Sequence, residues 1–66
     1  MKLTNAIKKL EKAGYKIATN GSFYSAFLDG SEITFTAYEG KTSKFCYSHT
    51  SGCETFGLTL KAAMGN

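Results

Sequence analysis

Three side chains able to bind a metal ion lie close together near the carboxyl end of the sequence. Cys46, His49 and Cys53 form a C-x2-H-x3-C spacing. Thiolate and imidazole are donors that Zn²⁺ prefers, but a structural zinc site needs four ligands, and Glu54 would have to be the fourth. The other interpretation is a buried cysteine, a loop histidine and an unrelated cysteine. A disulfide would require an oxidising compartment. We expect no bound metal and no cofactor.

The same segment holds the best candidates for catalysis. His49 is the only histidine, in the loop at residues 48–52. A cysteine beside a histidine can act as an activated nucleophile, but nothing in the pattern places a third group to orient the imidazole. The sequence contains neither a glycine-rich phosphate loop nor a paired-carboxylate motif. We therefore predict that the protein is not an enzyme.

An amphipathic helix is the first element that the pattern predicts. Its apolar residues recur with helical spacing and share one face: Leu3, Ala6, Ile7, Leu10 and Ala13. The opposite arc carries lysines, as either a solvated face or a docking surface for an acidic partner or phosphate: Lys2, Lys8, Lys9 and Lys12. We predict a helix over 3–13, with Thr4 as its N-cap and Gly14 just after its end.

Beyond the helix the apolar pattern changes to the two-residue period of strands. Turn signals at Asn20-Gly21, Asp29-Gly30 and, more weakly, Glu39-Gly40 separate the predicted strands. These strands cover residues 15–19, 22–28, 31–38 and 41–48. Residues 55–64 fit a strand or a short helix, and we favour the helix because 60–64 are good helix formers.

Hairpin register predicts which strand residues share a face, because residues that flank a two-residue turn pair directly. One face collects a continuous apolar set for the core: Tyr15, Ile17, Tyr24, Ala26, Leu28, Ile33, Phe35 and Ala37. The second face carries Phe23, Phe27 and Tyr38 among serines and threonines. A two-residue turn at 39–40 would add Phe45 and Tyr47 to this second face. A three-residue turn with a bulge would instead add Thr42, Lys44 and Cys46.

The second face is the predicted binding surface. One or two helices of a chain this short cannot cover both sides of the sheet, so some of these aromatic residues should be exposed, and exposed aromatic patches mark contact sites. Aromatic residues interleaved with lysine can stack nucleic-acid bases and neutralise phosphate. They are equally typical of a protein interface or a homodimer. The remaining alternative is that the carboxyl-terminal segment covers this face.

Composition sets the outer limits. The 66 residues are 42% hydrophobic, with nine Phe and Tyr, and we expect one small domain, 1–66. Eight lysines against five acidic residues give a net charge of +3, and arginine is absent. This charge favours solubility and acidic partners, whereas the lack of arginine disfavours base-specific readout. The pattern shows no signal peptide and no membrane span, so we expect a cytoplasmic protein with reduced thiols and no membrane partner.

The sequence from residue 3 to 15, LTNAIKKLEKAGY, resembles the opening of small phage-encoded accessory proteins, in which an Asn/Gly-turn hairpin follows the same helix. The resemblance covers residues 1–35 and implies a role in a bacterial host cytoplasm. The opening is also similar to HicA-type ribonuclease toxins, which have a double-stranded-RNA-binding-like fold. In that family a catalytic histidine follows Gly-Ser in the first hairpin, whereas Phe23 follows Gly21-Ser22 here. This resemblance implies the fold and an affinity for RNA without the ribonuclease chemistry.

We predict an α+β domain with an N-terminal helix, an antiparallel β-meander of three to four strands and a short C-terminal helix. The predicted function is a non-enzymatic, phage-type binding module that contacts a protein, from the host or a second copy, through the aromatic sheet face or the lysine-rich helix. The alternative is an RNA- or single-stranded-DNA-binding domain, and a ribonuclease-like toxin ranks third. The predicted partner-binding residues are Phe23, Phe27, Tyr38, Phe45, Tyr47, Lys16, Lys8, Lys9 and Lys12.

Overall fold

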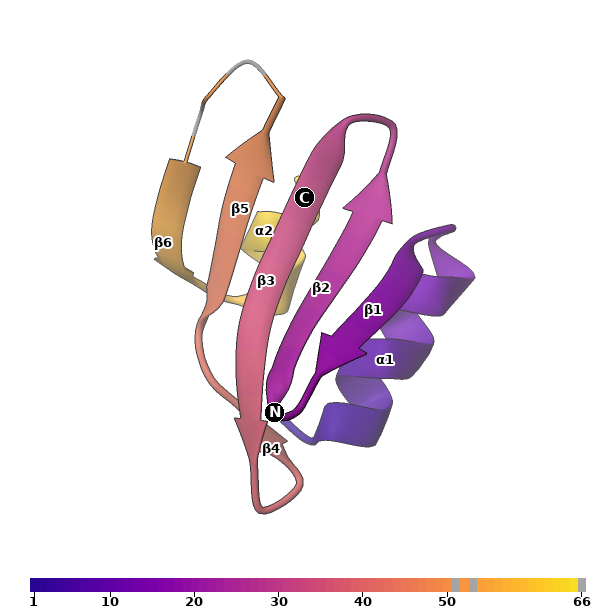
Figure 1. The fold of residues 1–66 in the computed structure, drawn as a ribbon, viewed down its shortest axis with the longest axis vertical. Helices are drawn as coiled ribbons and strands as arrows, with labels where there is room; N and C mark the ends of the chain where they lie inside the picture. Colours follow the sequence, from indigo (N-terminus) through magenta and orange to yellow (C-terminus); the bar gives the residue numbers. More distant parts are fainter. Residues whose placement is uncertain (51, 53, 66) are drawn as a thin grey trace.

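A computed structural model describes residues 1–50, 52 and 54–65 and confirms the α+β architecture (Figure 1). The elements are α1 (Leu3–Lys12), β1 (Lys16–Asn20), β2 (Phe23–Leu28), β3 (Ser31–Tyr38), β4 (Lys41–Thr42), β5 (Phe45–His49), β6 (Glu54–Leu58) and α2 (Leu60–Ala63). The strands run antiparallel in the order β1-β2-β3-β5-β6, and β4 pairs with β3. The sheet exceeds the predicted three to four strands because residues 41–48 divide into β4 and β5 and residues 54–58 add β6.

The start of α1 differs from the prediction. The N-cap is Lys2 rather than Thr4, and no side chain caps it. The preceding residues instead pair with the β3–β4 hairpin: the Leu3 amide donates to the Gly40 carbonyl at 2.8 Å, and the Thr42 amide donates to the Met1 carbonyl at 2.8 Å. Backbone partners thus hold the beginning of the helix, so a capping side chain is not required.

The end of α1 is as predicted. Gly14, with φ of 100°, follows the C-cap residue Ala13. The Gly14 amide donates to the Glu11 carbonyl at 3.0 Å, and the Tyr15 amide donates to the Leu10 carbonyl at 3.0 Å. This pair of bonds is a Schellman motif, which reverses the chain from the helix into β1.

The register of the first hairpin differs from the prediction by two residues. Asn20 pairs with Phe23, so Gly21-Ser22 forms the turn instead of Asn20-Gly21. Only the first turn position needs positive φ, and Gly21 supplies it with φ of 62°. The register moves by two residues, which preserves the alternation, so every residue keeps its predicted face. The second hairpin pairs Leu28 with Ser31, as predicted.

A β-bulge between β4 and β5 changes the face of the following strand. The Glu39-Gly40 turn has two residues and pairs Tyr38 with Lys41. The Ser43 hydroxyl then accepts a hydrogen bond from the Thr36 amide at 3.0 Å, in place of a backbone carbonyl, and donates to the Lys44 carbonyl at 2.9 Å. Because Lys44 is an extra residue in the ladder, the alternation reverses before β5. Cys46 therefore pairs with Thr34.

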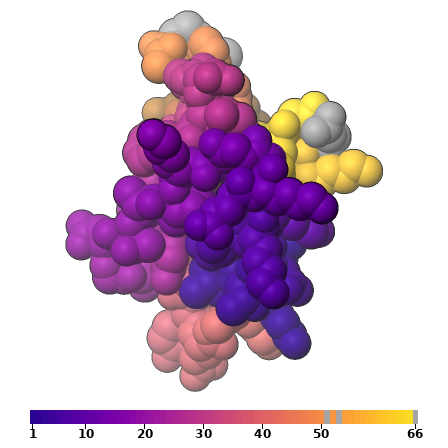
Figure 2. All heavy atoms as spheres, turned by 90° about the vertical axis from the view of Figure 1, so that its right-hand side faces the viewer, coloured from indigo at the N-terminus to yellow at the C-terminus, as the bar shows by residue number. Residues whose placement is uncertain are grey.

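Both helices pack on the same face of the sheet, behind the strands in Figure 1. The buried core on this face consists of Ala6, Leu10, Ala26, Ile33, Phe35, Phe45, Leu60 and Ala63. Three aromatic rings from neighbouring strands join it: Tyr24 stacks on Phe35 with centroids 5.3 Å apart, and Phe35 contacts Phe45 at 4.9 Å. Helix α1 contacts β1 and β4, and α2 contacts β5 and β6. Figure 2 shows α1 and β1, in indigo and purple, forming one side of the molecule.

The carboxyl-terminal segment is both a strand and a helix, where the prediction favoured a helix alone. Glu54–Leu58 forms β6, and α2 begins after Thr59. The Thr59 hydroxyl accepts a hydrogen bond from the Ala62 amide at 3.2 Å, which satisfies a donor at the start of α2.

We expect Thr59→Ala to lower the free energy of unfolding by about 1 kcal/mol, because it removes this cap. The matched control is Thr4→Ala, which lies inside α1 and caps nothing. We expect the control to change stability by less than about 0.5 kcal/mol. Urea denaturation of the two variants tests the prediction, and equal effects would contradict the capping role of Thr59.

Candidate binding face

Among residues 1–50, 52 and 54–65, no helix or strand covers the second side of the sheet. We call this surface the open face. It faces the viewer in Figure 1. The strand register arranges its side chains in rows that run across the sheet. The first row contains Lys16, Phe27, Glu32, Ser48 and Glu54; the second contains Ala18, Ser25, Thr34 and Cys46; the third contains Asn20, Phe23 and Thr36.

The two phenylalanines of β2 dominate this surface. Phe23 and Phe27 are 47% and 45% exposed, and they flank Ser25, which is buried. Tyr38, at the β3–β4 hairpin, is 80% exposed. The predicted exposure of these three aromatic residues is confirmed, and their role in binding stays a prediction. The second row, between the two phenylalanines, carries only small side chains.

Two other predicted contact residues do not lie on the open face. Phe45 is 3% exposed and belongs to the core. Tyr47 packs against that core, and its hydroxyl lies 3.2 Å from the Ser31 hydroxyl. The prediction placed both on the second face by continuing the alternation beyond the Glu39-Gly40 turn. It was wrong because the bulge at Ser43 and Lys44 reverses that alternation.

Tyr15 is partly buried on the core side of the sheet. Burial raises the pKa of the Tyr15 phenol, and the neighbouring Tyr47 phenol raises it further. A raised phenol pKa keeps the group protonated and neutral at physiological pH. Tyr15 and Tyr47 therefore serve the packing between the sheet and α2, where they line the same pocket with Ala63 and Met64.

The predicted lysines are divided between the two sides of the molecule. Lys16 is on the open face, beside Phe27 in the register. The exposed residues Lys8, Lys9 and Lys12 are on α1, which lies against the opposite face of the sheet. The thickness of the sheet therefore separates the helix lysines from the exposed aromatic residues, whereas Lys16 and Lys41 lie beside Phe27 and Tyr38.

One exposed aromatic residue was not among the predicted contact residues. Phe56 belongs to the segment 55–64, which fitted a strand or a helix and for which the helix was favoured, but it lies in β6, near the irregularity in its pairing with β5, and is 70% exposed. The alternation of Glu54, Phe56 and their neighbours was an available strand signal. Cys46 was a conditional member of this face, and the bulge places it there. Lys41 precedes the bulge and reaches the face through the two-residue turn that pairs it with Tyr38.

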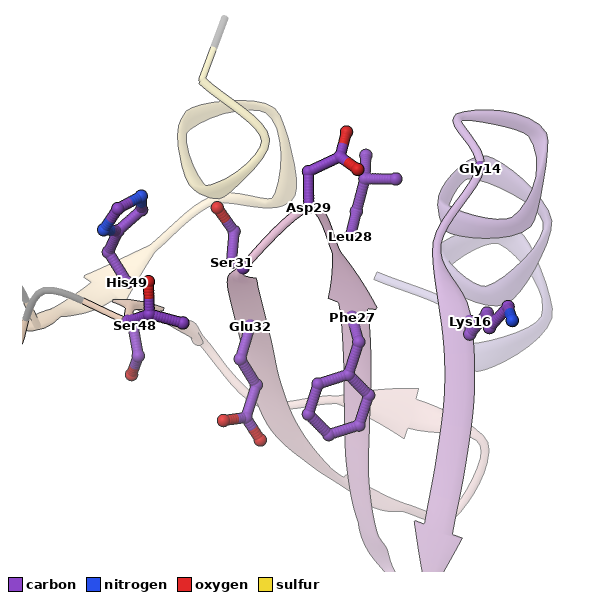
Figure 3. A pocket seen from close by; sticks show the side chains of 11 residues that line it. Gly14, Lys16, Phe27, Leu28, Asp29, Ser31, Glu32, Ser48 and His49 are labelled. Atoms are coloured by element: carbon purple, nitrogen blue, oxygen red, sulfur yellow. The ribbon is translucent and has the colours of Figure 1, made fainter.

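A pocket of about 470 Å³ borders the open face at the β2–β3 hairpin (Figure 3). Phe27, Glu32 and Ser48 project to one side of the strands in this view, whereas Asp29 projects to the other. These polar groups therefore do not converge on one point. The pocket continues the open face around the end of the hairpin.

Of the three candidate metal ligands, the structure describes Cys46 and His49. Cys53 lies outside the described residues. Cys46 is a free thiol on the open face, and His49 ends β5. Within the described parts of the chain, no three His, Cys, Asp or Glu side chains gather closely enough to hold a metal ion.

No family model matches this chain, and neither a curated protein nor a solved structure matches it. The functional interpretation therefore comes from the geometry of the chain itself. In the described residues, neither helix has the length and apolar character required to cross a bilayer.

Proposed function

We propose that this protein is a non-enzymatic binding module that contacts a protein partner through the open face. The carrying observation is that Phe23, Phe27 and Phe56 are exposed together on a sheet surface that both helices leave uncovered. Covering one phenylalanine side chain contributes about 1.5–3 kcal/mol, so a partner that buries part of these rings gains substantial affinity. Aromatic anchors of this kind supply much of the energy of protein interfaces.

The distribution of charge supports a protein partner at this surface. The helices carry four lysines, Lys8, Lys9, Lys12 and Lys61, against one acidic residue, Glu11. The first row of the open face carries Lys16 against Glu32 and Glu54. A surface that stacks nucleic-acid bases also needs positive charge along the path of the phosphates. The open face as a whole carries Lys16 and Lys41 against Glu32 and Glu54, so its aromatic rings are not accompanied by net positive charge.

The resemblance of residues 1–35 to phage-encoded proteins supports the finer proposal that the protein acts in a bacterial host cytoplasm, with either a host protein or a second copy as its partner. A capture experiment with bacterial lysate, performed with and without nuclease treatment, tests it. We expect a captured protein that resists nuclease, with a loss of about tenfold or more in Phe23→Ser and Phe27→Ser. Both residues are about half exposed, so we expect a stability loss of only about 1–1.5 kcal/mol in thermal melts.

The matched control is a Lys8→Glu, Lys12→Glu variant, which changes the helix side and leaves the open face intact. We expect it to retain the captured protein. Capture that persists in both phenylalanine variants would contradict the proposal, because the open face would then not be the contact surface.

Nucleic-acid binding is the second candidate function, and the lysines of α1 and α2 favour it on the helix side. Such binding would involve phosphate contacts without base stacking, so it would depend strongly on salt. A titration with single-stranded RNA and DNA at increasing salt tests this candidate. Affinity that falls linearly in log salt and is lost in the Lys8→Glu, Lys12→Glu variant would support it. Capture that disappears with nuclease treatment would point the same way.

A further inference from the structure

The open face has an acidic end and a basic end. Glu32 and Glu54 lie toward the β2–β3 hairpin, with Lys16 as the opposing charge in the same row. At the other end, Lys41 pairs with Tyr38 and forms a bridge with Lys2, and Glu39 of the turn between Tyr38 and Lys41 is the opposing charge.

These two ends are far apart in one chain. Glu32 and Tyr38 are both in β3, and six residues of extended strand cover about 20 Å. Glu32 therefore cannot pair with Lys41 of its own chain. A second chain that lies antiparallel on the first would bring each acidic end against a basic end.

We infer that the partner of the open face is a second copy of this chain, packed face to face about a two-fold axis that crosses β3 between Thr34 and Thr36. This inference rests on the proposed function of the open face and names its occupant. Glu32 of each copy then lies over Lys41 and Tyr38 of the other. Phe23 of each copy lies over the small side chain of Ser25 in the other. Large side chains thus meet small ones, and opposite charges meet at both ends.

The positive charge of the helix side disfavours a contact between the helices of two copies. The net charge is +3, and the outer side of the helices is the most positive surface, so contact between the helix sides would bring lysines together. The open face is the side on which two positively charged copies can approach with favourable pairing. A two-fold contact of this kind uses the same patch on both copies and closes as a dimer.

The area of the open face limits how stable the dimer can be. Five strands at about 4.8 Å spacing and about 20 Å of strand length give roughly 500 Å² per copy, or about 1,000 Å² in total. This area is at the low end for specific protein interfaces. We therefore expect a weak dimer that forms as the concentration rises, rather than an obligate one.

Sedimentation of the full chain across a range of concentrations tests the inference. The average mass of the wild-type protein should rise from 7.1 kDa toward twice that value. Glu32→Lys and Lys41→Glu should each weaken association by about two- to thirtyfold, since each removes two symmetric ion pairs. The double variant Glu32→Lys, Lys41→Glu should restore association, because the exchanged charges pair again.

The control variants make the same charge changes on the helix side: Glu11→Lys, Lys8→Glu and both together. They should leave association unchanged. A wild-type mass of 7.1 kDa at every concentration would overturn the inference, as would failure of the double variant to recover association when its thermal midpoint is normal. If the protein is a monomer and its capture of a host protein depends on Phe23 and Phe27, the inference of a second copy is overturned but the proposed function stands. If the protein is a monomer and its capture of a host protein does not depend on these residues, the proposed function is overturned as well.

Discussion

Leu10→Ala is expected to lower the free energy of unfolding by about 2–5 kcal/mol. Leu10 is fully buried in the core that joins α1 to the sheet, with Ala26 and Ile33 in the same cluster. Truncating it removes apolar contacts and leaves a cavity beneath the helix. A domain of this size buries a limited core, so a loss of this magnitude approaches its whole stability. The variant should therefore be largely unfolded at moderate temperature.

Circular dichroism during thermal and urea denaturation measures this effect. The matched control is Lys8→Ala, an exposed position of the same helix, where alanine is an even better helix former. We expect the control to stay within about 0.5 kcal/mol of the wild type. If Leu10→Ala and Lys8→Ala melt at the same temperature, α1 does not pack on the sheet as described.

The second large effect is expected from Phe45→Ala, which should cost about 3–5 kcal/mol. Phe45 is 3% exposed, and its ring centroid lies 4.9 Å from that of Phe35. Phe56→Ala is the matched comparison, because Phe56 also belongs to a strand but is 70% exposed. We expect Phe56→Ala to change stability by about 0.5 kcal/mol or less. The difference between these two phenylalanines depends directly on the bulge at Ser43 and Lys44.

Urea denaturation of both variants provides the measurement, and their melting curves should be clearly separated. If Phe56→Ala is the more damaging substitution, the bulge is not formed and β5 has the opposite orientation. Phe45 would then return to the open face, where the alternation along the sequence had placed it.

The elements that depend on neighbouring residues were predictable from the sequence. The spacing of Leu3, Ala6, Ile7 and Leu10 determines a helix with one apolar side, and Gly14 ends it. The Asp29-Gly30 pair determines a two-residue turn, because both residues take positive φ, 47° and 80°. The core face of β1, β2 and β3 follows from these turns. The predicted core face was correct even though the register of the first hairpin was wrong by two residues, because a shift of two residues preserves the alternation.

The candidate site was predictable only in part, because the alternation of side chains predicts the correct face only as far as the bulge. Phe23, Phe27 and Tyr38 precede the bulge, so alternation placed them on the correct face. Phe45 and Tyr47 follow it and were misplaced. A bulge depends on whether the Ser43 side chain can replace a backbone acceptor for Thr36, seven residues away. That contact exists only when the two strands are already paired, so the spacing of residues along the chain does not predict it.

The sequence by itself determined an α+β domain with an amphipathic, lysine-bearing helix and an aromatic meander whose first three strands have one apolar face. The tertiary structure alone decided three further features: the orientation of β5, the placement of both helices on one side, and the separation of the helix lysines from the exposed aromatic rings. The physical reason is that these features depend on contacts between segments distant in the chain. A helix and a strand each specify their own apolar side, but which segment covers that side is settled by packing. The carboxyl-terminal segment covers Phe45 and not Phe23 because the bulge turns Phe45 toward α2, beside Leu60 and Ala63 in one core.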